Sequence, residues 1–209
     1  FESEDGAIFN LDMHSTNFEN IIGSYYNDTL TGDNNINTIT GDNPETNYGE
    51  GDDVIFGLGG NDILSGNGGN DQIDGGKGAD TIETGDGEDT ILLREGDGGN
   101  TITEADTITD FLSGTDQIKF GVTGDATASS GNYVEASTSV SSLSAAQAAA
   151  NLALNTLNGT SSATKLYSFQ YDSSNGYLFK DDNSDGTADG MFILVGIDHT
   201  EIAASDIIA

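Results

Sequence analysis

Residues 48–92 consist of five consecutive nine-residue segments that align without a gap. The segments read YGEGDDVIF, GLGGNDILS, GNGGNDQID, GGKGADTIE and TGDGEDTIL. Position four is always Gly, position six is always Asp, and position eight is always Ile or Leu. The aspartates are Asp53, Asp62, Asp71, Asp80 and Asp89, and the apolar residues are Ile55, Leu64, Ile73, Ile82 and Ile91. Because one unit cannot bury its apolar residue alone, this period predicts a solenoid of stacked units.

Each unit divides into a glycine-rich turn and a three-residue strand. Glycine permits the positive φ angles of a tight turn, and the strand's central residue points inward while its neighbours point outward. Two units therefore make one flattened coil of 18 residues, with coils stacked about 4.8 Å apart. This arrangement places Asp53, Asp71 and Asp89 in one column of carboxylates, and Asp62 and Asp80 in another.

Stacked carboxylates repel each other, and the units have little else to hold them together. Burying one Ile or Leu contributes about 1.5–3 kcal/mol. Ordering each of the nine residues costs about 1–2 kcal/mol of backbone entropy. A hard divalent cation bound by carboxylate and carbonyl oxygens would supply the missing free energy, and calcium accepts such irregular oxygen cages better than magnesium does.

The composition agrees with a cation partner. The chain carries 36 acidic and 5 basic residues, a formal net charge of −31. This charge disfavours nucleic acid and anionic membranes as partners, and no apolar run approaches the roughly 20 residues of a membrane helix. With no cysteine, the chain has neither disulfides nor thiolate metal sites. The N-terminus lacks the pattern of a secretory signal peptide and an initiator Met, so we expect a fragment or a processed product.

The segments resemble the G-G-x-G-x-D-x-U-x nonapeptide of the RTX (hemolysin-type) calcium-binding repeats, and residues 75–83 match it in full. The resemblance implies an all-β-dominated fold, a right-handed parallel β-roll with calcium in the turns, followed by a small α+β capping region with one helix. It also implies at least three calcium sites, between Asp53 and Asp71, Asp62 and Asp80, and Asp71 and Asp89. The turn residues that would contribute carbonyls are Gly49, Gly51, Gly57, Gly59, Gly60, Gly66, Gly68, Gly69, Gly75, Gly76, Lys77, Gly78, Gly85 and Gly87.

Some units depart from the pattern. Leu58 and Asn67 replace the second glycine and Thr84 the first, which is tolerable where only a carbonyl is needed. The weaker flanking units are 23–31 with Asp28, 32–40 with Asn37 and 95–103 with Asn100. Asp28 is a further candidate ligand, whereas the two asparagines predict weak or absent sites. Residues 41–47 interrupt the phase between the two halves.

The resemblance divides the chain into three parts: N-terminal cap strands (1–22), the RTX roll (23–109) and a C-terminal capping region with a secretion signal (110–209). Residues 105–120 predict two strands that cover the open end of the roll. Residues 141–159 predict a helix, and 165–172, 176–182 and 191–197 predict an antiparallel sheet packed on it. The ending GIDHTEIAASDIIA resembles family C-termini that are recognised by the type I secretion apparatus.

The segment DDNSDGTAD (181–189) has the oxygen-rich spacing of an EF-hand loop. Phe192 occupies the position of the bidentate Glu, which disfavours an EF-hand. An acidic, Gly-containing hairpin turn is the favoured interpretation, with a calcium site as the alternative.

No catalytic motif is found, and neither His14 nor His199 lies in a sequence cluster typical of a metal or catalytic site. The sequence therefore predicts a non-enzymatic, extracellular calcium-binding module that folds outside the cell and supports type I secretion of a larger protein. An adhesin or surface protein is the first interpretation of that larger protein. The alternative is the C-terminal tail of a secreted protease, lipase or polysaccharide-modifying enzyme. Thr-x-Thr triplets at 29–31, 38–40 and 101–103 raise ice binding as a third, disfavoured interpretation.

Overall fold

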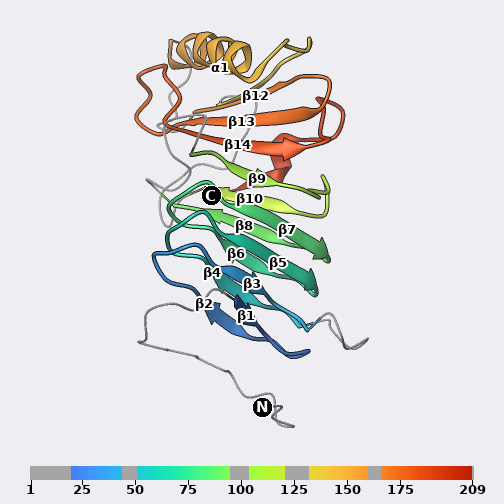
Figure 1. Ribbon diagram of the computed structural model, residues 1–209. Coiled ribbons are helices and arrows are strands. Elements are labelled where there is room, and N and C mark those ends of the chain that lie inside the picture. The colour runs from blue at the N-terminus through green and yellow to red at the C-terminus, as the bar shows by residue number, and fades with distance from the viewer. Residues whose placement is uncertain (1–19, 44–50, 95–103, 121–131, 160–165, 209) are drawn as a thin grey trace.

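The computed structural model describes residues 20–43, 51–94, 104–120, 132–159 and 166–208. Short strands of the first half alternate between two stacked parallel sheets (Figure 1). One sheet takes β1 (Asn20–Ile22), β3 (Thr38–Thr40), β5 (Ile63–Gly68), β7 (Thr81–Asp86) and β9 (Asp106–Ile108). The other takes β2 (Thr29–Thr31), β4 (Val54–Phe56), β6 (Gln72–Asp74), β8 (Thr90–Leu93) and β10 (Gln117–Phe120). The fold is therefore the parallel β-roll that the repeat predicts.

The position-eight residues form the core between the two sheets. Ile73 pairs in register with Ile55 on one side and with Ile91 on the other, and Leu64 pairs with Ile82. All five side chains are fully buried. Each unit therefore contributes a single side chain to the core, and the core of the roll is narrow.

The roll also continues through the segments that interrupt the period. Partner aspartates lie 18 residues apart in the regular units, as for Asp53 and Asp71. The step is 25 residues between Asp28 and Asp53, so the interruption at 41–47 lengthens one coil without changing the register. The step is 26 residues between Asp80 and Asp106. Extra residues are thus accommodated between strands, and the stacking of the strands is kept.

Residues 105–120 add another coil to the roll. They form two strands, as predicted, but β9 joins one sheet and β10 the other, so neither lies across the open end. Ile108 and Ile118 continue the rows of Ile82 and Ile91. Phe120 contacts the capping region, because its ring packs edge-on against the ring of Phe192 with the centroids 5.7 Å apart.

The capping region extends the first sheet without a break. Strand β9 pairs in parallel with β14 (Gly190–Val195), which is antiparallel to β13 (Asn175–Asp181), and β13 is antiparallel to β12 (Leu166–Tyr171). Strand β11 (Tyr133–Glu135) forms the far edge. The C-terminal β15 (Ile207–Ile208), preceded by the 3₁₀ turn Ala204–Asp206, pairs with β10 and covers the edge of the second sheet.

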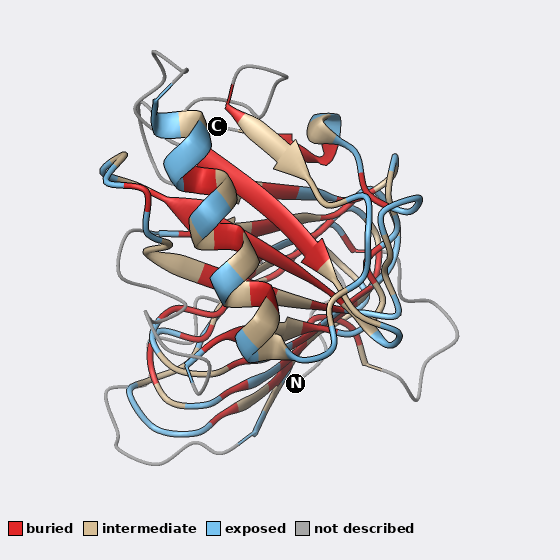
Figure 2. Cartoon of the chain, turned by 90° about the horizontal axis from the view of Figure 1, so that it is seen from above, coloured by how far each residue is buried: buried red, intermediate tan, exposed pale blue. Residues whose placement is uncertain are grey.

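Helix α1 (Leu143–Asn158) is the helix predicted at 141–159, and it covers β12 and β13. Ser142 caps its first turn by accepting the N–H of Ala145. The buried stripe of Ala146, Ala150 and Leu154 faces the strands beneath (Figure 2). No helix among the described residues is both long and apolar enough to cross a membrane. The Thr-x-Thr triplets of β2 and β3 lie in different sheets, which disfavours a single ice-binding ladder; the third triplet lies outside the described residues.

Candidate metal centres in the turns

The position-six side chains form two columns along the roll. The first column contains Asp28, Asp53, Asp71, Asp89 and Asp116, and the second contains Asn37, Asp62, Asp80 and Asp106. Within a column, each backbone N–H donates to Oδ1 of the member one coil further on. The N–H of Asp53 donates to Asp71 at 2.7 Å, and that of Asp62 donates to Asp80 at 2.7 Å. The columns are therefore built by direct contacts between coils.

In four of the five regular units, the second carboxylate oxygen is buried without a hydrogen bond from the described residues. Oδ2 of Asp53, Asp62, Asp71 and Asp89 accepts none from the described residues, and each of these side chains is only 1% exposed. A buried carboxylate oxygen in this condition costs free energy unless a proton or a cation satisfies it.

Other oxygens lie beside these atoms. A Cβ added to Gly57 would collide with the carbonyl oxygen of Gly75 in the next coil, and would lie 2.5 Å from Oδ2 of Asp62. A Cβ on Gly66 would collide in the same way with the carbonyl of Thr84 and with Oδ2 of Asp71. Gly57 and Gly66, both at position one, therefore each leave space that is lined by one carbonyl and one carboxylate oxygen. This donor set suits a hard cation.

Burial also changes the acidity of these groups. Loss of hydration, together with the neighbouring carboxylates of Asp71, Asp42 and Asp28, raises the pKa of Asp53 to about 8. The same causes raise the pKa of Asp62 and of Asp71 to about 7 and that of Asp89 to about 6. Near neutral pH, the folded roll without metal therefore holds a proton on Asp53, where a cation could replace it.

We expect the calcium-stripped roll to become less stable as pH rises. The folded-state pKa values of about 6 to 8 lie above the ordinary value of 3.8, so the folded state binds more protons than the unfolded chain between these limits. This contribution is fully present below about pH 4 and is lost as pH rises through the folded-state values. Circular dichroism of calcium-stripped protein at about pH 5 and at about pH 8 tests the expectation, since a larger folded fraction is expected at the lower pH. Greater stability at the higher pH would contradict it.

The family comparison agrees with this geometry. The RTX calcium-binding nonapeptide repeat, a model of four copies, matches residues 18–43, 48–82 and 65–100. Residues 18–43 and 48–100 therefore match RTX calcium-binding repeats. No match is found among the curated proteins.

Two solved structures resemble the chain carrying these RTX repeats. Both are solution structures of subunits of the mannuronan C5-epimerase of Azotobacter vinelandii. AlgE6R3 is 22% identical with a TM-score of 0.46, covering 88% of this chain and 80% of its own. AlgE6R2 is 24% identical with a TM-score of 0.42, covering 90% of each chain. At this similarity, neither supports an inference about the function of this chain.

The structure places most of the predicted RTX site residues between the strands, but Gly66 and Gly68 lie within β5 and Gly85 lies within β7. Asp53, Asp71 and Asp89 share one column with Asp28, and Asp62 and Asp80 share the other. The predicted carbonyl residues from Gly51 to Gly87 lie within the described residues, and Gly49 lies outside them. The carbonyl of Lys77 accepts the N–H of Gly60, in the adjacent coil, at 2.9 Å.

Carbonyls are an essential part of any metal site here. Within the described ranges, no three acidic or histidine side chains converge as a metal-binding group. Two carboxylates of a column lie one coil apart, so backbone oxygens must supply most of the ligands. This fits the RTX pattern, in which the glycine-rich turns bring backbone carbonyls to a common point.

Sequence reasoning missed Asp106 and Asp116. The segment 95–103 with Asn100 was expected to be the next unit, and it lies outside the described residues. The side chain that follows Asp80 in its column is Asp106, whose Oδ1 accepts the N–H of Asp80 at 2.9 Å. The Asp-x-Ile triplet would have identified both residues, since Asp106-Thr-Ile repeats Asp80-Thr-Ile and Asp116-Gln-Ile repeats Asp71-Gln-Ile.

The acidic segment 181–189 forms the turn between β13 and β14. Asp181 is fully buried, and its carboxylate accepts the N–H groups of Asn183 at 3.2 Å and of Gly186 at 2.8 Å. Oδ2 of Asp189 accepts the N–H of Asp182 at 2.8 Å. These carboxylates organise the turn itself, in agreement with the favoured hairpin interpretation.

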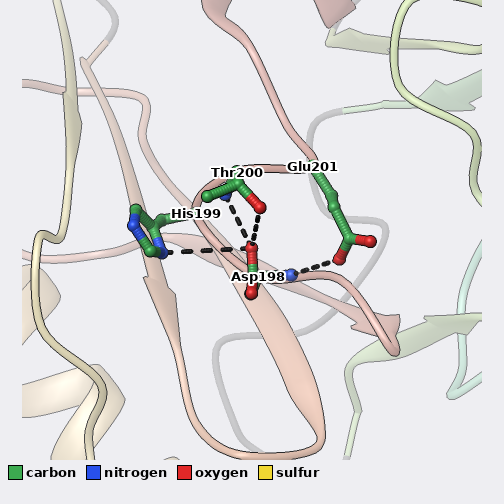
Figure 3. Close-up of polar contacts among 4 residues, drawn as sticks. All are labelled: Asp198, His199, Thr200 and Glu201. Carbon is green, nitrogen blue, oxygen red and sulfur yellow. Dashed lines mark hydrogen bonds and ion pairs between the residues drawn. The ribbon is translucent and has the colours of Figure 1, made fainter.

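His199 lies on an exposed loop at the C-terminal end (Figure 3). Its Nδ1 is 3.9 Å from Oδ1 of Asp198, and its ring stacks on Tyr171 with the centroids 4.9 Å apart. The hydroxyl of Thr200 donates to Asp198 at 2.7 Å and not to the imidazole. The group therefore lacks the contact between nucleophile and base that covalent catalysis requires. His14 lies outside the described residues.

Proposed function

We propose that calcium ions bind in the turns of this roll and hold it closed. The ligands are the carboxylates of Asp53, Asp62, Asp71, Asp80 and Asp89, together with carbonyls of positions one to four of the repeats, giving at least three sites. The observation that supports this most strongly is that the buried Oδ2 atoms of Asp53, Asp62 and Asp71 accept no hydrogen bond from the described residues and each lie beside a backbone carbonyl. Calcium takes six to eight oxygen ligands in flexible geometry, and such an arrangement can provide them.

This dependence makes folding a response to calcium. Without the ion, repulsion within the columns and the backbone entropy of glycine keep the roll open. An ion that binds only the folded form stabilises it by RT ln(1 + [L]/Kd) at each site. Because calcium is scarce in the cytosol and abundant outside, the chain stays open during passage through a type I secretion channel and folds after it.

We further propose that this module has no catalytic site and serves a larger extracellular protein, an adhesin or surface protein. The extracellular location is supported by the proposed calcium sites in the turns and by the absence of cysteine, since an extracellular chain without disulfides needs another means of stabilisation. The alternative, the tail of a secreted enzyme, would be recognised by a catalytic domain upstream of Phe1.

Isothermal calorimetry on the metal-stripped chain tests the proposed calcium binding. Titration with calcium chloride is expected to show at least three equivalents and a heat that includes folding, and magnesium chloride is expected to give neither. No binding, or the same folding transition with magnesium, would contradict the proposal.

A further inference from the structure

We propose that the turns at Asp28, Asn37 and Asp116 are closed by hydrogen bonds and take no calcium, which confines calcium to the turns between them. This inference rests on the proposed calcium-binding function and deepens it, because it assigns the turns that bind and those that do not. It also revises the sequence-based expectation that Asp28 is a ligand.

The three turns share a hydrogen bond that spans four residues. Oδ2 of Asp28 accepts the N–H of Ser24 at 2.6 Å and its hydroxyl at 2.8 Å. Oδ1 of Asn37 accepts the N–H of Asp33 at 2.8 Å, and Oδ2 of Asp116 accepts the N–H of Leu112 at 2.7 Å. In each case the donor is the residue at position two of the same unit. The position-six oxygen is therefore satisfied within its own turn.

Three of the regular units lack this bond. In the turns of Asp62, Asp71 and Asp89, Oδ2 accepts nothing from the part of the chain that is described. Their position-two residues have positive φ angles: Leu58 (75°), Asn67 (74°) and Gly85 (100°). The N–H of Gly85 donates instead to Oδ2 of Asp110, at 2.9 Å. In these turns, a left-handed backbone at position two thus occurs together with a position-six Oδ2 that accepts no hydrogen bond from the described residues.

The cause is visible in the sequence of the units. Regular turns have Gly at position four, and Gly60 and Gly69 adopt φ angles of 121° and 108°. The units of Asp28 and Asn37 have Tyr26 and Asn35 there, and neither residue adopts a positive φ. Residues with a Cβ rarely occupy this backbone region, so these units fold into the hydrogen-bonded turn.

The turn of Asp116 does contain a glycine with positive φ, Gly114 (79°). This turn is instead fixed by hydrogen bonds to the C-terminal segment. Asp206 accepts the N–H of Gly114 at 3.2 Å and the hydroxyl of Ser113 at 2.6 Å. The N–H of Asp116 itself returns to the carbonyl of Leu112 at 2.8 Å, so the first column ends there. At the opposite end, Oδ1 of Asp28 accepts no hydrogen bond from the described residues, because this column has no earlier coil among them.

Calorimetric stoichiometry on the full chain tests the assignment. Asp28→Asn is expected to leave the number of calcium equivalents unchanged, because Asn37 already closes an equivalent turn with an amide oxygen. Asn37→Asp alone is also expected to leave it unchanged. The triple variant Asp33→Gly, Asn35→Gly, Asn37→Asp converts 32–40 into a regular unit and is expected to gain a calcium equivalent. Asp53→Asn changes the first carboxylate of the column whose Oδ2 accepts no hydrogen bond from the described residues, and it is expected to lose binding.

Three outcomes would overturn the inference. These are a lost equivalent in Asp28→Asn, a gained equivalent in Asn37→Asp alone, or no gain in a triple variant whose circular dichroism in calcium matches the parent. If the parent chain binds no calcium at all, the proposed function fails instead, so the two failures are distinguishable.

Discussion

Replacing Asp71 with asparagine is expected to shift the calcium concentration needed for folding upward by roughly ten- to a hundredfold. Asp71 lies in the middle of its column, where its Oδ1 accepts the N–H of Asp53 and its buried Oδ2 accepts no hydrogen bond from the described residues. An amide can still accept the N–H, but it places an NH₂ group where the cation would bind. Disrupting a buried polar site costs about 1–3 kcal/mol, which corresponds to that change in concentration. Circular dichroism during a calcium titration measures the midpoint.

Asp86→Asn is the matched control, because it removes the same charge from an exposed side chain in strand β7. Its folding midpoint is expected to stay close to that of the parent chain. Equal shifts in the two variants would show that net charge, and not the column, governs the calcium dependence.

Replacing Ile73 with alanine is expected to lower the free energy of unfolding in saturating calcium by about 2–5 kcal/mol. Ile73 is fully buried between Ile55 and Ile91, and it is the apolar side chain that its unit contributes to the core. A narrow core of stacked single residues has few neighbours that can move into the cavity. Urea denaturation of parent and variant measures the difference.

Ile63→Ala provides the comparison on the outer face. Ile63 is in strand β5 one residue before Leu64, and it is 53% exposed. Its replacement is expected to change the free energy of unfolding by no more than about 0.5 kcal/mol. A loss of similar size at both positions would contradict the inward direction of position eight.

The sequence was sufficient to predict the parts of the fold that depend on the period. Position eight of each unit is buried in the core, and Asp53, Asp71 and Asp89 stack as the 18-residue repeat requires. These features follow from local rules, because the side-chain alternation of a strand and the turn preference of glycine act within one unit. The helix at 143–158 was predictable for the same reason, from its alanine-rich sequence and its Ser142 cap.

Features that depend on contacts between distant residues were not predictable in this way. The step of 25 residues from Asp28 to Asp53 keeps the columns in register across an insertion, although the sequence period is lost there. The pairing of β9 with β14 joins the roll to the capping sheet through residues more than eighty positions apart. The closed turns of Asp28 and Asn37 follow from the residue that replaces glycine at position four, whereas the closed turn of Asp116 depends on its contact with the distant Asp206.

Hydrogen exchange of the whole chain, with calcium and after its removal by a chelator, tests most directly whether metal ions hold the roll closed. The amides of β4 to β8 are expected to be protected with calcium and to exchange freely without it at neutral pH. Helix α1 serves as an internal reference, because it packs on the capping sheet and not on the turns. Equal protection of residues 51–94 in both conditions would contradict the account.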